Sequence, residues 1–157
     1  MVSMKITGAH VVFHRLLRTN PVASVCAVLL CKRTQDAPTY PGCWALIGGK
    51  LENGEEPLAG ALREVEEELG ISLSETTPEL LCDVRVQRNA DRHPIGARYF
   101  AVPLSLGMDN LTLKYNSEEQ KVEGEGLGWF TAEEIHHLRL RPEDRVALEK
   151  FFEQSGL

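Results

Sequence analysis

Residues 48–71 read GGKLENGEEPLAGALREVEEELGI, and their pattern is the most informative in the chain. The second half predicts a helix over Pro57–Leu69, because proline suits the first helical turn and apolar residues recur at spacings of three and four. Gly70 suits the left-handed position just past a helix end. Ahead of the helix, Asn53-Gly54 predicts a tight turn. We therefore expect an extended segment that turns back into a helix.

Three glutamates share one face of this predicted helix. Glu64, Glu67 and Glu68 are spaced by three and four residues, and the apolar residues lie on the opposite face. Like charges at this spacing destabilise a helix by about 0.2–0.5 kcal/mol per pair. One interpretation is a solvated acidic face. The other is a site for a hard cation such as Mg²⁺ or Mn²⁺, and the flanking glycine turns favour it because they let the backbone approach a ligand closely.

The segments on either side predict a sheet. Apolar and β-branched residues predict strands over 6–17, 24–32, 44–47, 80–88, 98–106, 111–115 and 126–130. A turn is expected over 18–21. Within 80–88, apolar and polar residues alternate, which predicts a half-buried strand. The residues expected on its inner face are Leu80, Cys82, Val84 and Val86.

Two more helices are expected near the C-terminus. Thr131 and Glu134 have the spacing of a capping box, which opens a short helix. A last helix is expected over Pro142–Gln154, with Val146, Phe151 and Phe152 among its apolar positions. Strands before and after the first helix, followed by terminal helices, predict an α/β protein with a mixed sheet and helices packed on it.

Composition narrows the class of protein. The 157 residues suit one domain over 1–157, and 43% apolar with 25% charged residues is ordinary for a globular chain. A net charge of −6 argues against a general nucleic-acid coat protein. We expect no membrane-spanning segment, secretory signal or DNA-binding segment. The four cysteines form no C-x-x-C pair, which favours reduced thiols in a cytoplasmic protein over disulfides or zinc.

The stretch resembles the Nudix box, whose pattern is G-x5-E-x7-R-E-U-x-E-E-x-G-U with U a bulky aliphatic residue. Every specified position matches, and these positions are Gly49, Glu55, Arg63, Glu64, Val65, Glu67, Glu68, Gly70 and Ile71. Many family members have proline before the paired glycines, where this chain has Ile47. Proline there would only make the loop entry more rigid, so we expect little effect on the chemistry.

The resemblance implies a hydrolase of nucleoside diphosphates linked to another group, with a Nudix-type α/β/α sandwich and mixed sheet. It implies that Glu67 and Glu68 bind divalent metal, and that Glu64 is a metal ligand or the general base. It also implies a backbone-carbonyl ligand at Gly48. Glu55 and Arg63 resemble the pair that ties the loop to the helix, and a buried-edge pair of this kind would hold both in register. Lys50 is expected to contact substrate phosphate.

A further glutamate is expected from a later loop. In MutT-like members a metal-binding glutamate lies six residues before a tryptophan, which by alignment to Trp129 is Glu123. Glu125 and then Glu119 are the alternatives. The sequence leaves open which glutamate within residues 118–125 joins the site.

The charges themselves support a metal-dependent reaction. A pyrophosphate approaching an acidic patch is repelled unless cations lie between them. Divalent metals neutralise the phosphate and activate water, and a nearby carboxylate can take the proton. Glu64 is the first candidate for that base, with a remote glutamate as the alternative.

We therefore expect a pyrophosphohydrolase that uses Mg²⁺, with Mn²⁺ as a substitute, on a nucleoside triphosphate or another nucleoside diphosphate-linked compound. The alternative is a non-catalytic Nudix-fold sensor that binds nucleotide. Intact Glu64, Glu67 and Glu68 argue against it, because such modules commonly lose residues of the box. The partner is a small nucleotide or nucleotide conjugate, and the sequence leaves open which one it is and whether the chain forms a homodimer.

Overall fold

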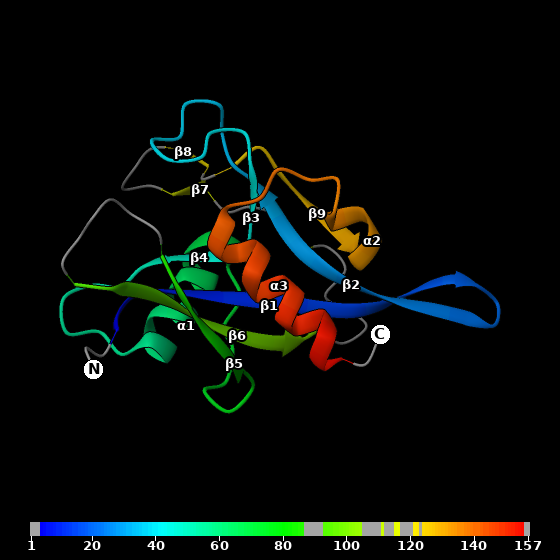
Figure 1. Ribbon diagram of the computed structural model, residues 1–157, viewed down its shortest axis with the longest axis horizontal. Helices are drawn as coiled ribbons and strands as arrows, with labels where there is room; N and C mark the ends of the chain where they lie inside the picture. The colour runs from blue at the N-terminus through cyan, green and yellow to red at the C-terminus, as the bar shows by residue number, and fades with distance from the viewer. Residues whose placement is uncertain are drawn as a thin grey trace.

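The computed structural model describes residues 4–86, 93–104, 111, 115–116, 121–122 and 124–155 (Figure 1). Its helices are α1 (Pro57–Leu69), α2 (Ala132–Ile135) and α3 (Pro142–Gln154). Its strands are β1 (Lys5–Asn20), β2 (Ala23–Lys32), β3 (Trp44–Ala45), β4 (Ile47–Lys50), β5 (Glu79–Arg85), β6 (Ile95–Pro103), β7 (Tyr115–Asn116), β8 (Lys121–Val122) and β9 (Gly126–Thr131). Among the described residues, no helix is both long and apolar enough to cross a membrane.

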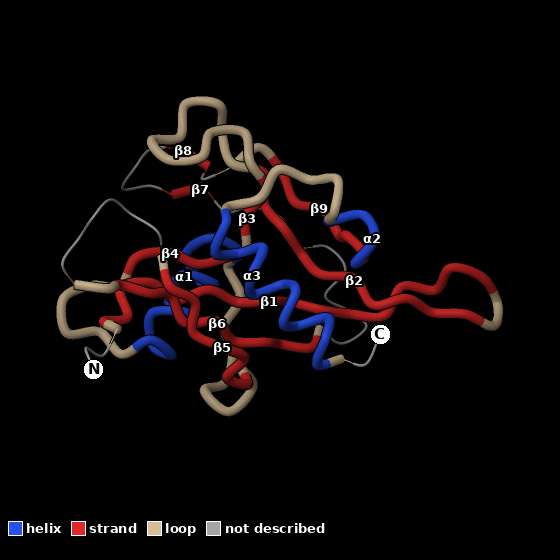
Figure 2. The backbone as a smooth tube through the Cα atoms, viewed as in Figure 1, coloured by secondary structure: helices blue, strands red, loops and turns tan. Residues whose placement is uncertain are grey.

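The strands form a mixed sheet around the long strand β1. The order along the sheet is β3-β2-β1-β6-β5, while β4 also pairs with β1 and β9 with β2. β1 and β6 are parallel, and the other pairs in this sheet are antiparallel. Past His14, β1 and β2 continue together as a hairpin that extends beyond the rest of the sheet (Figure 2).

Each face of the sheet carries a hydrophobic core. On one face, Val11 and Phe13 of β1 pack in the cluster that includes Val65 of α1. On the other, Val12 packs in the cluster that includes Leu148 of α3 and Ile135 of α2. This alternation along β1 buries both faces, as expected when consecutive strand residues point to opposite sides. The chain is therefore the α/β/α sandwich with a mixed sheet that the sequence predicts (Figure 1).

Several local predictions are confirmed. α1 and α3 have the predicted bounds. Gly70 ends α1 in the left-handed conformation, with φ 71°. The Thr131 hydroxyl accepts the Glu134 N–H, and the Glu134 carboxylate accepts the Thr131 N–H, so the capping box is formed. The four cysteines all lie in the described residues and are not joined in disulfides.

Other local predictions differ from the structure. Leu80 is 64% exposed, because a bulge between Leu80 and Cys82 inserts an extra residue into β5 and changes the face on which Leu80 lies. Val146 is 41% exposed on the outer side of α3. The predicted strand 44–47 is two strands interrupted at Leu46, and the second continues through both glycines to Lys50.

The remaining differences concern strand ends. β1 runs on to Asn20, so the turn expected over 18–21 is shorter than predicted. β6 begins at Ile95, earlier than the sequence suggests. The ends of the predicted strands 80–88 and 98–106, and most of 111–115, lie outside the described residues.

Candidate active site

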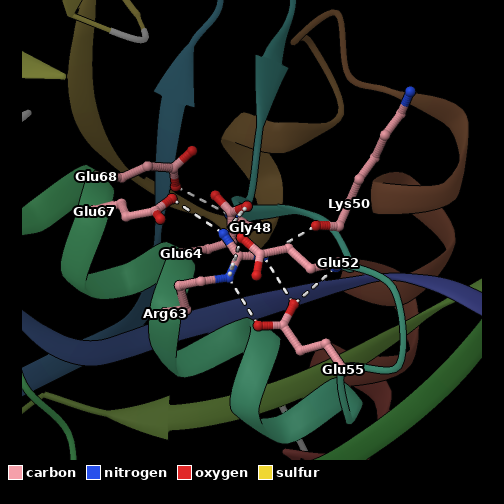
Figure 3. A network of polar contacts seen from close by, with 8 residues as sticks. All are labelled: Gly48, Lys50, Glu52, Glu55, Arg63, Glu64, Glu67 and Glu68. Carbon is pink, nitrogen blue, oxygen red and sulfur yellow. Dashed lines mark hydrogen bonds and ion pairs between the residues drawn. The ribbon is translucent and has the colours of Figure 1, made fainter. Parts of the chain in front are cut away.

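The box residues are arranged by a strand, a turn and a helix. β4 pairs antiparallel with β1, and the Leu51 N–H continues this pairing by donating to the Thr7 carbonyl at 2.9 Å. The Asn53-Gly54 turn then reverses the chain, with Gly54 at φ 76° and the Glu55 N–H donating to the Glu52 carbonyl at 3.0 Å. This turn leads the chain into α1, so the acidic face of the helix lies beside β4 (Figure 3).

The two glycines of β4 are needed for different reasons. Gly48 has φ 150°, and a Cβ there would overlap the Ala9 carbonyl and the His10 ring. A Cβ on Gly49 would lie 2.6 Å from a carboxylate oxygen of Glu64. Gly48 therefore supplies a backbone conformation that other residues rarely adopt, and Gly49 supplies the space in which the Glu64 carboxylate lies.

Arg63 ties the loop to the helix, as the sequence predicts. Its Nε and Nη2 donate to the two carboxylate oxygens of Glu55 at 2.8 and 2.9 Å. The Glu52 N–H donates to Glu55 Oε1 at 3.0 Å. These bonds, first that from Arg63 and then that from Glu52, lower the pKa of Glu55 to about 2. Pairing with Glu55 in turn raises the pKa of Arg63.

The same guanidinium also holds two of the three clustered glutamates. Arg63 Nη1 donates to Glu64 Oε1 and to Glu67 Oε2, both at 3.1 Å, and Nη2 donates to the Lys50 carbonyl at 3.1 Å (Figure 3). Glu67 is about half exposed, with 48% of its side chain accessible, while Glu64 is largely covered. Burial raises the pKa of Glu64 and outweighs the opposing charge of Arg63.

Glu68 meets the backbone of β4 directly. The Gly48 N–H donates to Glu68 Oε2 at 3.2 Å. The acidic face of α1 therefore contacts both glycines, Gly48 through Glu68 and Gly49 through Glu64. The structure thus brings together the box residues Glu55, Arg63, Glu64, Glu67 and Glu68 with the backbone of Gly48 (Figure 3).

The donors at this site fit a hard divalent cation by their chemistry, because they are carboxylate and backbone oxygens. Within the part of the chain that the structure describes, however, no three acidic, histidine or cysteine side chains converge on one metal position. The contacts explain why. Arg63 lies between Glu64 and Glu67, and Glu68 is directed at the Gly48 amide.

Lys50 is a predicted site residue that lies apart from the three glutamates. The side chain of Lys50 is exposed and extends away from the three glutamates in Figure 3, although its carbonyl is held by Arg63. Glu123 lies outside the described residues, as do Glu118 and Glu119. Glu125 is described, and its carboxylate lies 3.9 Å from the Lys32 ammonium.

The sequence analysis missed a second polar group, on the other side of Gly48. It consists of His10, Tyr99, Arg141 and Asp144, and Asp144 is fully buried. The sequence carried a signal for it. Asp144 is spaced from Leu148 and Phe151 as a residue on the apolar face of α3 would be, and His10 interrupts the apolar run of β1.

Comparison with known proteins agrees with this geometry. The NUDIX domain family model matches residues 13–151. The nucleoside triphosphatase NudI of Escherichia coli O139:H28 is 33% identical over 134 residues, which cover 83% of this chain and 89% of that protein. A MutT NUDIX hydrolase from Burkholderia pseudomallei is 30% identical with a TM-score of 0.60, covering 90% of this chain and 97% of that one.

A MutT protein from Methanosarcina mazei Go1 shares the fold, with a TM-score of 0.69, 21% identity and 99% coverage of both chains. The family match extends over most of the chain and includes both the box and the sandwich that presents it. The chain therefore belongs to the Nudix family and is a Nudix hydrolase.

Proposed function

We propose that this protein is a metal-dependent pyrophosphohydrolase that cleaves a nucleoside triphosphate by attack of water on phosphorus. The observation that carries the proposal is the contact between the acidic face of α1 and the glycine pair of β4. It brings the carboxylates of Glu64 and Glu68 against one backbone segment, and Arg63 holds Glu67 beside them. The similarity to a nucleoside triphosphatase supports the choice of substrate class.

The residues that would hold Mg²⁺ or Mn²⁺ are Glu64, Glu67 and Glu68, the carbonyl of Gly48, and Glu123. A bound divalent ion would neutralise phosphate charge and make a water more acidic. In the structure, the Arg63 guanidinium is the cation that holds Glu64 and Glu67. Metal binding therefore requires these carboxylates to exchange at least part of their contact with Arg63 for the metal.

Glu64 is the proposed base. Its carboxylate is covered, lies against Gly49 and is oriented by Arg63. Without metal, burial raises the pKa of this carboxylate. A carboxylate held within reach of a metal-activated water can take its proton. As the water oxygen bonds to phosphorus, Glu64 takes the proton and the phosphoanhydride P–O bond breaks, which releases pyrophosphate and the nucleoside monophosphate.

Arg63 and Glu55 would position Glu64 and would not take part in the reaction themselves. The two-point contact between them fixes the guanidinium, and the guanidinium fixes Glu64. We keep Lys50 as a contact for substrate phosphate. Its side chain is long and exposed, and Arg63 holds its backbone carbonyl. We also place the protein in the cytoplasm, a proposal that cysteines outside disulfides support.

A nucleotide screen with product analysis tests the function. The purified protein is incubated with each nucleoside triphosphate in Mg²⁺, in Mn²⁺ and in excess chelator, and phosphate is measured with and without added pyrophosphatase. We expect phosphate only when pyrophosphatase is added, and only with metal. Full turnover in chelator would overturn the metal mechanism. Nucleotide binding without any turnover would make the protein a sensor.

A further inference from the structure

A buried polar network lies on the α3 side of Gly48, opposite the acidic face of α1. Its centre is Asp144, which is 0% exposed. Asp144 Oδ1 accepts the Tyr99 hydroxyl at 2.6 Å. Its Oδ2 accepts Arg141 Nε at 2.9 Å and the Leu46 N–H at 3.1 Å. Burial alone would raise the pKa of Asp144, but the charge of Arg141 holds it below its usual range, so the carboxylate is ionised.

His10 connects this network to the glycine pair. Arg141 Nη2 lies 3.3 Å from His10 Nδ1, and since a guanidinium can only donate, Nδ1 accepts. The imidazole is stacked on the Tyr99 ring, with centroids 5.1 Å apart. His10 pairs with Gly48 across β1 and β4, and a Cβ on Gly48 would overlap the imidazole. The His10 ring is therefore packed directly against the Gly48 backbone.

The network thus holds residues 46–48 at two points. Asp144 binds the amide of Leu46, where the chain passes from β3 to β4. His10 packs against Gly48, whose own amide is bound from the opposite side by Glu68. Between these contacts the Gly48 peptide has little room to rotate, and its φ of 150° is one that few residues adopt.

Hydrophobic packing alone would be the simpler way to fill this space. A buried ion pair is often no more stabilising than apolar residues of the same volume, because both charges must be desolvated. What the pair provides here is a directional bond to one backbone amide. We propose that His10, Tyr99, Arg141 and Asp144 are positioning residues that fix the backbone of residues 46–48, and with it the Gly48 carbonyl that holds the metal. This inference rests on the proposed function, since it assumes that Gly48 is a ligand.

The test measures metal binding apart from turnover. His10→Ala removes the ring beneath Gly48, and Tyr99→Phe is a milder variant that removes one bond to Asp144 and keeps the ring. Mn²⁺ binding to each substrate-free protein is measured by titration calorimetry, alongside the Mg²⁺ concentration that gives half-maximal rate. Positioning groups around metal sites typically affect affinity by about 10- to 100-fold. We expect Mn²⁺ to bind about 10-fold more weakly to His10→Ala, and several-fold more weakly to Tyr99→Phe.

The matched control is Phe152→Leu. Phe152 belongs to the same core and lies about two helical turns further along α3 than Asp144. Phe152→Leu should therefore lower stability while it leaves the hydrogen bonds of Asp144 and the ring contact of His10 in place. All variants are compared at a temperature where urea unfolding shows them folded. The control should bind Mn²⁺ like the wild type. His10→Gln, which keeps an acceptor for Arg141, should recover part of the lost affinity.

Two results would overturn the inference. Unchanged metal affinity in both His10→Ala and Tyr99→Phe would show that the network is only structural, as would an equal loss in Phe152→Leu. In either case the wild type still binds metal and needs it for turnover, so the proposed function stands. If the wild type neither binds metal nor needs it, the proposed function and this inference fail together.

Discussion

Two polar networks lie on opposite sides of Gly48, and they differ in exposure and in charge balance. On the α1 side, one guanidinium lies within 3.1 Å of the carboxylates of Glu55, Glu64 and Glu67, and Glu67 is about half exposed. On the α3 side, Asp144 and Arg141 form one ion pair, with Asp144 fully covered. The first network carries an excess of negative charge, while the second is neutral as a whole.

This difference fits two tasks. A site that binds a divalent cation needs uncompensated negative charge and access from solvent, and the Arg63 network leaves two negative charges unbalanced even before Glu68 is counted. A buried network that holds the backbone needs paired charges and no access from solvent, because an unpaired buried charge is costly. Changes on the α3 side should therefore affect stability and, through residues 46–48, metal affinity, while changes on the α1 side should affect mainly activity.

The largest effect is expected from Asp144→Ala. It leaves Arg141 buried without its partner, and it removes the acceptor of the Tyr99 hydroxyl and the Leu46 amide. Breaking a buried pair in this way typically costs about 3–5 kcal/mol of unfolding free energy. Urea unfolding measures the loss. Asp83→Ala removes a carboxylate from an exposed pair and should cost far less. Equal losses in the two variants would contradict the comparison.

The next effect is on activity alone. Glu68→Gln keeps an oxygen that can accept the Gly48 N–H but removes a negative charge from the helix face. We expect kcat/KM at saturating Mg²⁺ to fall by about 100-fold or more, since the charge stabilisation that a bound metal provides amounts to several kcal/mol.

Stability without metal should hold or rise in Glu68→Gln, because like charges on the helix are relieved. Glu66→Gln is the matched control, since Glu66 is exposed on the same helix and should keep wild-type turnover. A Glu68→Gln protein with unchanged activity and lowered stability would make Glu68 structural.

The sequence predicted the α1 side of this comparison much better than the α3 side. The bounds of α1 and the Gly70 cap follow from local periodicity. The Glu55–Arg63 pair follows from the resemblance to the Nudix box, whose residues are close in the chain. The break at Leu46 depends on Asp144, which is 98 residues away. No local pattern specifies such a pairing, and the same is true of the bulge that exposes Leu80.

Arg63→Ala should lower both stability and activity, each by less than Asp144→Ala and Glu68→Gln respectively. It removes two charge-assisted bonds from Glu55 and the contacts that orient Glu64 and Glu67. We expect a loss of about 1.5–3 kcal/mol in unfolding free energy together with reduced turnover.

The control for Arg63→Ala is Arg98→Ala. Arg98 makes an equally close two-point pair with Asp83 at 2.8 and 3.0 Å, but both side chains are about one third exposed. Such a pair is worth about 0.2–1 kcal/mol, and activity should not change. If Arg63→Ala costs no more than Arg98→Ala and leaves turnover unchanged, the Arg63 network does not organise the site.

The smallest effect is a pH dependence on the α1 side. The bond from Arg63, and then that from the Glu52 amide, lower the folded-state pKa of Glu55 from 4.5 to about 2. As pH falls below the unfolded value, the unfolded chain binds a proton that the folded chain does not, so folding loses stability. The stabilisation of the folded state by ionised Glu55 is fully present above the unfolded pKa of 4.5, and it is lost as pH falls through the folded pKa of about 2. Glu55→Gln cannot titrate, so its deficit relative to the wild type should shrink between about pH 5 and about pH 3 in urea unfolding. A deficit that stays constant over this range would show that Glu55 is not held by Arg63 in solution.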